Sequence, residues 1–300
     1  MSRRLRVLIV CHDAGGAEIV SAWCRRHKSH EYRYVLAGPA RAIFRRKIAG
    51  VSCRSAEFLS AMVRKSDFVL TGTSWASEIE KKAIAAAKKN KVKVCSFLDH
   101  WVDYPARFQL RGKRVLPDEI WVGDREALKR ARRYFPHCRL RLKVNPYFQD
   151  IRKKIMESPR PPLDKNGLHI LYICEPISEQ SIRQYGKPDH WGYTEQEAIV
   201  KFLEKVAGDA KKKVSEIKVR LHPAESGRKY DFLLRRFPGL PIKIGSGRSL
   251  IEDCLRADWI VGCESMALVT GLLSGRRVFC AIPDPGIPCS LPHKQITRFT

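Results

Sequence analysis

Between residues 249 and 279 the chain reads S-L-I-E-D-C-L-R-A-D-W-I-V-G-C-E-S-M-A-L-V-T-G-L-L-S-G-R-R-V-F. Helical periodicity covers Leu250–Arg256 and Met266–Leu273, and a short apolar run follows each of them, at Trp259–Val261 and Arg277–Ala281. Short apolar runs separated by helices are typical of a parallel sheet covered by helices on both faces. This segment therefore predicts a doubly wound α/β domain.

The same alternation runs along the rest of the chain, without an internal repeat or a low-complexity tract. In the first half, the predicted strands are Arg6–Cys11, Tyr32–Leu36, Phe68–Leu70, Lys93–Phe97, Glu119–Val122 and Leu140–Val144. The predicted helices there are Ala17–Arg26, Arg41–Ile48, Ala56–Lys65, Ala76–Asn90 and Arg125–Tyr134. The second half adds the strands Leu168–Cys174, Glu216–Leu221 and Pro241–Ile244 and the helices Thr194–Gly208 and Arg228–Phe237.

A polar, proline-rich segment separates the two halves. It includes E-S-P-R-P-P-L-D-K-N-G and predicts an interdomain linker over residues 151–166. Residues 1–150 and 167–300 then form one domain each, which suits a length of 300 residues. The predicted fold class is α/β, with two Rossmann-like, doubly wound domains facing each other across a cleft, the arrangement called GT-B.

The net charge of +26 is the strongest feature of the composition. Residues 1–150 carry a net charge of +18, and residues 151–300 carry +8. A field of this size attracts polyanions, which include nucleic acid, anionic lipid headgroups and acidic polymers. Charge alone does not choose among them. The sequence contains no recognisable nucleic-acid-binding motif, so nucleic acid is the least expected partner.

The chain is expected to be cytoplasmic, with peripheral contact at the inner membrane face as a further expectation. Its N-terminus, M-S-R-R-L-R-V-L-I-V-C-H-D, is basic and then apolar. The apolar run has only about five residues, so a first β-strand is a better interpretation than a signal peptide. No apolar stretch reaches the ~20 residues that cross a bilayer. The ten cysteines lie singly, which favours reduced, buried thiols.

Ligands of parallel sheets bind at the carboxyl ends of the strands, so the residues there are the first candidates. After the first strand, Gly15 and Gly16 permit a tight turn before a helix whose N–H groups suit an anion. His12 and Asp13 stand beside that turn, where either side chain could accept a proton from a hydroxyl group. The alternative is that Asp13 only caps the helix.

A second candidate loop follows the strand that ends at Phe97. Asp99 and His100 emerge directly from the sheet and are catalytic candidates, with a buried structural Asp–His pair as the alternative. Asp103, Tyr104 and Arg107 suit an acceptor pocket in the same loop.

In the second half, Glu175 and Pro176 open a loop of about twenty residues in which aromatic and polar side chains alternate. That loop predicts either a wall for base stacking or a mobile lid. The next strand ends at V-R-L-H-P, where Pro223 favours an extended His222 before it and a helix after it. An imidazole at that edge can donate a hydrogen bond to a phosphate oxygen, and its pKa would rise beside that charge.

A matching site is expected two strands later. Gly262 ends a strand, and Glu264, Ser265 and Met266 begin a helix whose N–H groups and serine hydroxyl suit a phosphate. With the strand order 3-2-1-4-5, His222 and Ser265 would flank the central strand and bracket one phosphate or diphosphate.

The segment 249–279 resembles the donor domain of GT-B glycosyltransferases. The L-H-P element resembles the His-Pro motif of bacterial sialyl-, polysialyl- and Kdo-type transferases, in which the histidine contacts the CMP phosphate of the donor. Ser265 matches the serine that binds phosphate in those enzymes, and the Gly-Gly turn with Asp13 is similar in placement to their acceptor-side loop and catalytic base. The resemblance implies donor binding by residues 167–300 and acceptor binding by residues 1–150.

The resemblance implies an inverting, metal-independent glycosyltransferase that uses a CMP- or UDP-type sugar as co-substrate, without a further cofactor. The acceptor would be a cell-surface glycan, or another anionic or lipid-linked molecule. No D-x-D motif or zinc-type cluster is present, so no metal ligand is predicted. Residues 267–271 lack the acid that holds the donor ribose in many GT-B enzymes, which leaves the nucleotide open. The alternatives are a nucleotide-sugar hydrolase or epimerase and a non-catalytic, basic nucleic-acid-binding protein.

Overall fold

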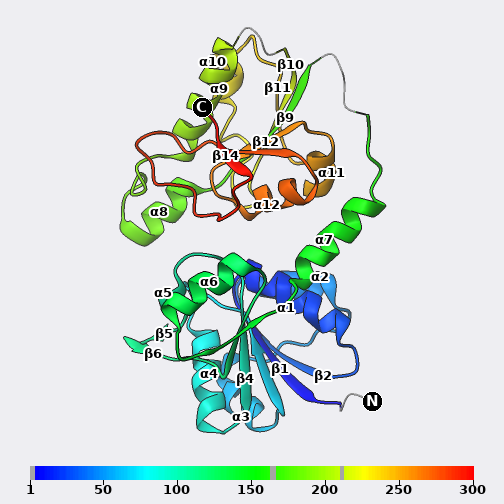
Figure 1. The fold of residues 1–300 in the computed structure, drawn as a ribbon, viewed down its shortest axis with the longest axis vertical. Helices are drawn as coiled ribbons and strands as arrows, with labels where there is room; N and C mark the ends of the chain where they lie inside the picture. Colours follow the sequence, from blue (N-terminus) through cyan, green and yellow to red (C-terminus); the bar gives the residue numbers. More distant parts are fainter. Residues whose placement is uncertain (1–3, 163–166, 210–212) are drawn as a thin grey trace. The chain divides into compact units, whose positions relative to one another are not determined.

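The computed structural model describes residues 4–162, 167–209 and 213–300 (Figure 1). The chain divides into two compact units, residues 1–150 and residues 151–300, and each contains its own six-stranded sheet. The division falls inside α7 (Pro146–Glu157), a helix that was not predicted. Residues 151–157 of the expected linker are therefore helical, and residues 163–166 lie outside the described residues. Within the described ranges, no helix is long and apolar enough to cross a bilayer.

The sheet of unit 1 is parallel throughout and has the order β2-β1-β3-β4-β7-β8. Its strands are β1 (Arg6–Cys11), β2 (Glu31–Leu36), β3 (Phe68–Thr71), β4 (Lys93–Leu98), β7 (Glu119–Val122) and β8 (Arg139–Leu142). All six strands predicted for this half are present. The strand order reverses at β1, so the carboxyl ends of β1 and β3 form the switch point at which ligands of such sheets bind.

Helices cover both faces of this sheet. They are α1 (Ala14–Arg26), α2 (Ala40–Lys47), α3 (Leu59–Arg64) after the 3₁₀ turn η1 (Ala56–Phe58), α4 (Ile79–Lys89) and α6 (Arg125–Tyr134). Both α1 and α4 pack against β1, β3 and β4. Every residue from Val7 to Cys11 is buried, as a strand covered on both faces requires.

Two details of unit 1 differ from expectation. The first helix begins at Ala14, so Gly15 and Gly16 belong to its first turn and do not form a turn before it. The segment between β4 and β7 was expected to be a long loop. It contains the short helix α5 (Tyr104–Arg107) and the two-stranded hairpin of β5 (Gln109–Leu110) and β6 (Lys113–Arg114).

β8 forms one edge of this sheet. Arg139 and Arg141 lie 3.5 and 3.9 Å from the carboxylate of Glu119 in β7, on the same face as the following Lys143. The opposite face of the strand carries Leu142, and its side chain is 48% exposed. The edge thus alternates between cationic and apolar side chains.

Unit 2 has the sheet order β11-β10-β9-β12-β13-β14, also parallel throughout. Its strands are β9 (Leu168–Ile173), β10 (Val214–Arg220), β11 (Ile242–Ile244), β12 (Trp259–Gly262), β13 (Arg277–Cys280) and β14 (Ile296–Arg298). In chain order this is 3-2-1-4-5-6, which confirms the expected order of the first five strands. The sixth strand, β14, was not predicted.

The helices of unit 2 are α8 (Ile177–Tyr185), α9 (Glu195–Gly208), α10 (Phe232–Arg236), α11 (Leu250–Leu255) and α12 (Met266–Leu273). The prediction of a twenty-residue loop after Glu175 is wrong, because α8 fills its first half. The helix predicted at Arg228–Phe237 is shorter than expected. α9 begins with a capping box between Thr194 and Glu197, the pattern expected of a stable N-terminus.

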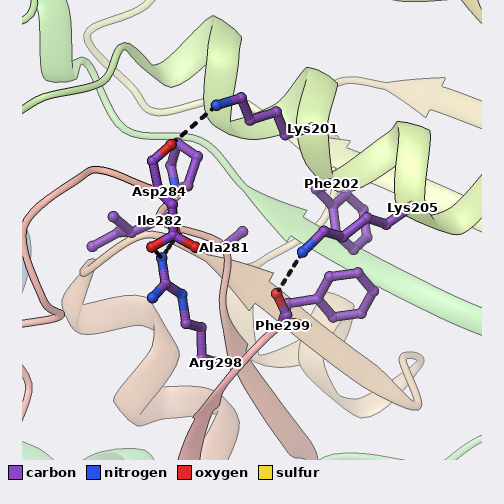
Figure 2. Close-up of a pocket in the computed structure, with 9 residues that line it drawn as sticks. Lys201, Phe202, Lys205, Ala281, Ile282, Asp284, Arg298 and Phe299 are labelled. Atoms are coloured by element: carbon purple, nitrogen blue, oxygen red, sulfur yellow. Dashed lines mark hydrogen bonds and ion pairs between the residues drawn. The ribbon is translucent and has the colours of Figure 1, made fainter.

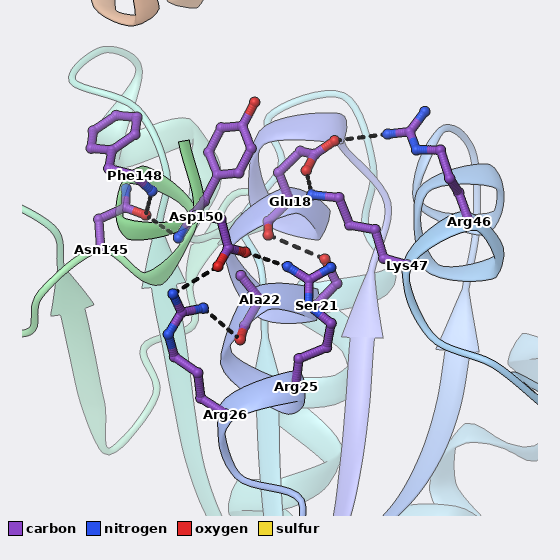
Figure 3. A network of polar contacts seen from close by, with 11 residues as sticks. Glu18, Ser21, Ala22, Arg25, Arg26, Arg46, Lys47, Asn145, Phe148 and Asp150 are labelled. Atoms are coloured by element: carbon purple, nitrogen blue, oxygen red, sulfur yellow. Dashed lines mark hydrogen bonds and ion pairs between the residues drawn. The ribbon is translucent and has the colours of Figure 1, made fainter. Parts of the chain in front are cut away.

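The first turn of α7 is attached to α1 by ion pairs (Figure 3). The carboxylate of Asp150 accepts hydrogen bonds from Arg26 at 2.7 Å and from Arg25. Two turns earlier on α1, Glu18 pairs with Arg46 at 3.0 Å and with Lys47, both in α2. These contacts join α1, α2 and the start of α7 within unit 1.

Candidate functional site

His12 and Asp13 form a pair at the switch point of unit 1. They follow β1 directly, and Nδ1 of His12 lies 2.6 Å from Oδ1 of Asp13. Asp13 has the extended backbone of an N-cap residue, but its carboxylate makes no capping bond with α1. Both side chains are partly exposed, at 27% and 23%. The carboxylate of Asp13 therefore bonds to the imidazole of His12 and does not cap the helix. Both side chains are accessible to a ligand.

Glu80 lies beneath this pair and was not singled out in the sequence. It is 1% exposed in α4, and its Oε1 accepts the backbone N–H of His12 at 2.7 Å. Its Oε2 has no hydrogen-bond partner in the part of the chain that the structure describes. Burial raises the pKa of Glu80 to about 8, so the side chain is mostly protonated at neutral pH. One feature of the sequence indicates that Glu80 is buried, because it shares a helical face with the apolar residues Ala83 and Ala87.

Gly15 and Gly16 bring the first turn of α1 close to the strand ends. A Cβ on Gly16 would lie 3.0 Å from the Cα of Gly72, which follows β3. A Cβ on Gly15 would overlap the carboxylate of Asp99, which follows β4. The structure thus gives both glycines a packing role, and their contact with an acceptor stays a prediction.

Asp99 is the centre of a buried ion pair. Its Oδ1 accepts hydrogen bonds from Thr73 at 2.7 Å and from Arg107 at 2.8 Å. Arg107 also donates to the hydroxyl of Thr73 and to the carbonyl of Val102. The side chains of Asp99 and Arg107 are only 7% and 5% exposed. The partner of Asp99 is thus Arg107 and not His100, which differs from the structural Asp–His pair that was the alternative, and a catalytic role for Asp99 stays a prediction.

The other candidates of this loop are divided between interior and surface. His100 is largely enclosed, burial lowers the pKa of its imidazole, and its Nδ1 lacks a partner among the described residues. Tyr104 is buried and packs against Phe135 with ring centroids 6.3 Å apart. Of the three residues expected in an acceptor pocket, Asp103 alone is exposed, because Tyr104 and Arg107 lie in the interior.

In unit 2, three strand ends meet at the switch point. β9 pairs with β10 on one side and with β12 on the other. Glu175 follows β9, His222 follows β10, and the turn Gly262–Ser265 follows β12. The sheet therefore brings the two expected phosphate ligands, His222 and Ser265, to either side of one central strand, with Glu175 between them.

His222 is held in a defined orientation by short-range contacts. Its backbone N–H donates to Oε2 of Glu225 at 3.0 Å, and its Nδ1 accepts the N–H of Ala224 at 3.2 Å. An Nδ1 that accepts leaves the proton of the neutral ring on Nε2. Burial lowers the pKa of His222, which favours that neutral form in the absence of a ligand. The side chain therefore presents one N–H donor.

Glu175 occupies part of the expected anion site. Its Oε1 accepts the backbone N–H groups of Cys263 at 3.1 Å and Glu264 at 2.9 Å. These are the amides of the Gly262–Ser265 turn that the sequence assigned to a phosphate. Burial is the largest cause that raises the pKa of Glu175 to about 7, and the nearby carboxylate of Glu264 adds to it. The site therefore already holds one carboxyl group of the chain.

The remaining residues of that turn have internal partners as well. Ser265 caps its own helix, because its hydroxyl accepts the N–H of Ala267 at 3.2 Å. Glu264 accepts the N–H of Ser290 at 3.3 Å. At Gly262 a Cβ would lie 3.1 Å from the carbonyl oxygen of Ile173, so a larger residue would press on β9. Met266 begins α12, and Pro176 is buried before α8.

Lys229 is the centre of an ion-pair cluster that includes Glu225, a partner of His222. Lys229 was not identified from the sequence. Its ammonium group lies 2.5 Å from Glu195, 2.7 Å from Glu179 and 2.9 Å from Glu225. The side chain of Glu225 is fully buried and also accepts the hydroxyl of Tyr230. The three carboxylates raise the pKa of Lys229. Glu225, three residues after His222, was the nearest visible clue to this cluster.

A cavity of about 200 Å³ in unit 2 lies between α9 and the ends of β13 and β14, and none of the predicted site residues lines it (Figure 2). Its cations are engaged within the chain. Lys201 donates to the carbonyl of Asp284 at 3.2 Å, and Arg298 pairs with the carboxylate of the same residue at 2.5 Å. Over the described ranges, no group of three or more His, Cys, Asp or Glu residues is placed to hold a metal ion.

No known family model matches this chain, and no curated protein matches it. Solved structures do. UDP-GlcNAc 2-epimerase from Neisseria meningitidis bound to UDP-GlcNAc matches with a TM-score of 0.59 at 13% identity, over 94% of this chain and 83% of its own. MurG from Acinetobacter baumannii gives 0.54 at 11% identity, over 93% and 79%. The glycosyltransferase SnogD from Streptomyces nogalater gives 0.50 at 14%, over 93% and 82%. The chain thus has two parallel-sheet α/β domains of the GT-B-like fold, as predicted.

Proposed function

We propose that this chain is a glycosyltransferase that takes a sugar from a nucleotide-activated donor bound to unit 2. The observation that carries the proposal is the arrangement at the switch point of unit 2. His222 presents an Nε2–H donor at the end of β10, on the other side of β9 from the turn at the end of β12, where Glu175 holds the amides of Cys263 and Glu264. A switch point with such donors is where an α/β sheet binds a nucleotide phosphate.

The leaving phosphate is the group that His222 would stabilise. As the bond between the anomeric carbon and the phosphate oxygen breaks, negative charge grows on that oxygen. A hydrogen bond from a ring that can become an imidazolium strengthens as that charge grows, which lowers the barrier. The proposal assigns His222 to the leaving group, in agreement with its neutral, Nε2-protonated resting form.

The proposed base is the His12–Asp13 pair of unit 1. With its Nδ1–H directed at Asp13, the imidazole has Nε2 free to take the proton of an acceptor hydroxyl. That oxygen then bonds to the anomeric carbon, and the nucleotide leaves with its phosphate. A single displacement of this kind inverts the configuration at the anomeric carbon. Asp99 has a structural role in this scheme, since Arg107 and Thr73 share its carboxylate.

The acceptor is proposed to be anionic or lipid-linked, because unit 1 carries most of the positive charge. One fold neighbour, SnogD from Streptomyces nogalater, is named a glycosyltransferase, which supports sugar transfer. A surface glycan made at the inner membrane face would bring such an acceptor to a basic protein.

A thermal-shift panel of CMP, CDP, UDP, GDP and TDP tests the donor site. A nucleotide at about 100 times its Kd stabilises its protein by roughly 2.7 kcal/mol, which for a chain of this size raises Tm by about 5 °C or more. At least one nucleotide should produce this shift in the wild type and a smaller one in His222→Ala. His137→Ala is the control, because His137 is an exposed histidine of unit 1. A panel without any response in the wild type would refute the donor site.

The second candidate is a nucleotide-sugar epimerase or hydrolase. It is favoured by the fold match to UDP-GlcNAc 2-epimerase and by the openness of the His12–Asp13 pair, which can take a proton from a bound sugar or from water. Incubation with UDP-GlcNAc and no acceptor separates the candidates. An epimeric product or free UDP and sugar supports this second function, whereas turnover that requires an added acceptor supports transfer.

A further inference from the structure

A groove of about 470 Å³ runs along the edge strand β2 of unit 1. None of its lining residues belongs to the strand-end sites. One wall is formed by β2 and by the segment that bridges to it between Tyr34 and Cys53. The other wall is formed by η1 and α3. A volume of this size lies within the range of small-ligand pockets.

Three cations line the groove: Arg33 and Arg54 from the first wall, and Lys65 from the second. The guanidinium group of Arg54 and the ammonium group of Lys65 make no ion pair or hydrogen bond with another described residue. Arg33 contacts Glu31 on its own strand at 3.2 Å, where both side chains are more than a third exposed. Such a pair is weak, so the charge of the groove is nearly uncompensated.

The groove also carries apolar surface that the chain itself does not cover. Phe58 of η1 is 55% exposed, and Met62 of α3 forms part of the floor and is buried. The exposed ring of Phe58 and the side chain of Met62 form apolar surface that a hydrocarbon chain can contact. A cationic wall next to hydrocarbon-binding surface suits a ligand that has both an anionic and an apolar part.

We infer that this groove binds an anionic lipid at a membrane surface, with its phosphate against Arg33, Arg54 and Lys65 and its hydrocarbon against Phe58 and Met62. The net charge of +18 on unit 1 would draw the same face toward an anionic leaflet. Nucleic acid fits less well, because its backbone needs an extended track of cations, and three cations line this groove. The inference goes beyond the proposed sugar transfer and does not depend on the nucleotide site.

Vesicle sedimentation tests the inference. The full chain should bind phosphatidylcholine vesicles that contain 30 mol% phosphatidylglycerol and should not bind vesicles of pure phosphatidylcholine. Arg54→Gln/Lys65→Gln should weaken that binding about 30-fold. Each cation near an anionic surface contributes roughly a fivefold gain in affinity, and the double variant loses two of them. Arg132→Gln/Arg133→Gln is the matched control, because it removes the same charge from exposed positions of α6 and should weaken binding far less.

A second pair of variants examines the apolar part. Phe58→Ser should weaken vesicle binding, whereas Tyr134→Ser, which alters another exposed ring of unit 1, should leave it unchanged. Circular dichroism and Tm verify that all four variants fold. Equal losses in the groove and control variants would overturn the inference, as would a wild type that does not bind. A 20-nucleotide DNA that loses affinity with Arg54→Gln/Lys65→Gln, while vesicle binding persists, would assign the groove to nucleic acid instead.

Discussion

At the scale of single residues, the carboxylates that follow β1 and β4 of unit 1 are held in opposite ways. Asp99 is buried and shared between Thr73 and Arg107. Asp13 is partly exposed, and its one partner among the described side chains is His12. A proton acceptor has to be reachable by the group that gives up the proton. This contrast separates two candidates that looked equivalent in the sequence.

Replacing Asp13 by Asn should lower turnover by about 10²- to 10⁴-fold, because the amide has no negative charge to stabilise the imidazolium and its NH2 group can hold the ring in the other tautomer. Nucleotide binding should persist, since the donor is assigned to unit 2. The thermal shift with the best nucleotide and the rate with its sugar donor measure the two effects. Glu126→Gln is the control, as Glu126 is an exposed carboxylate of the same unit. Full activity of Asp13→Asn would remove this residue from the mechanism.

Nucleotide binding should depend on the ionisation of Glu175. Burial and the neighbouring Glu264 raise the pKa of Glu175 to about 7, so it is neutral below pH 7 and negative above it. A bound phosphate is repelled by the charged form, and affinity should therefore fall as pH rises from 6 to 8. In Glu175→Gln this part of the pH dependence should vanish, leaving only the titration of the ligand and the other groups. Identical pH profiles for the two proteins would show that Glu175 does not face the phosphate.

Glu80 should make the stability of unit 1 depend on pH. Its pKa is about 8 in the folded chain and near 4.5 when it is exposed, so the folded state holds the proton longer. The contribution of Glu80 to the free energy of unfolding is complete below about pH 4.5 and is lost as pH rises through 8. The total loss is about a few kcal/mol. Urea unfolding at pH 5, 7 and 8.5 should show a smaller decline in Glu80→Gln than in wild type. The exposed neighbour change Glu78→Gln should leave the decline intact.

At the scale of elements, the strands and long helices were predictable because their apolar periodicity is local. The elements that were missed depend on distant contacts. β14 has three residues and becomes a strand only by pairing with β13, and the four-residue α5 is fixed by the interior contacts of Tyr104 and Arg107. α8 follows Pro176 in a segment rich in turn residues, which hid its helical pattern.

The candidate site was predictable to the same extent. The rule that parallel sheets bind at strand ends selected His12, Asp13 and His222 from the sequence alone. It did not reveal Glu80 or Lys229, because their roles come from contacts across 68 residues with His12 and across 34 residues with Glu195. It also did not reveal that Glu175 occupies the amides intended for a phosphate.

The attachment of α7 to α1 gives a prediction for an element. Asp150→Ala removes the shared partner of Arg25 and Arg26, which leaves two cations side by side. We expect a loss of about 1 kcal/mol and a Tm lower by roughly 2–4 °C. Glu157→Ala is the control on the same helix, because its pair with Lys153 is exposed on both sides. A Tm unchanged in both variants would mean that these ion pairs do not stabilise the helix.

At the scale of the whole molecule, both units repeat one plan. Each has six parallel strands, helices between them and a switch point with polar side chains. The charge is not repeated, because residues 1–150 carry a net charge of +18 and residues 151–300 carry +8. This asymmetry supports a division of labour in which unit 2 selects a small nucleotide and unit 1 meets a larger anionic partner.

The alternating side chains of β8 also bear on self-association. An edge strand leaves backbone N–H and C=O groups unpaired, and another copy of the chain can pair with them. Arg139, Arg141 and Lys143 would place like charges against each other in such a pairing, while Leu142 would favour it. Replacing the three cations by Gln should therefore cause aggregation at high protein concentration and low salt, with the folded content of dilute samples unchanged. Light scattering measures this aggregation. A variant that stays as monodisperse as the wild type would show that the three cations do not prevent self-association at β8.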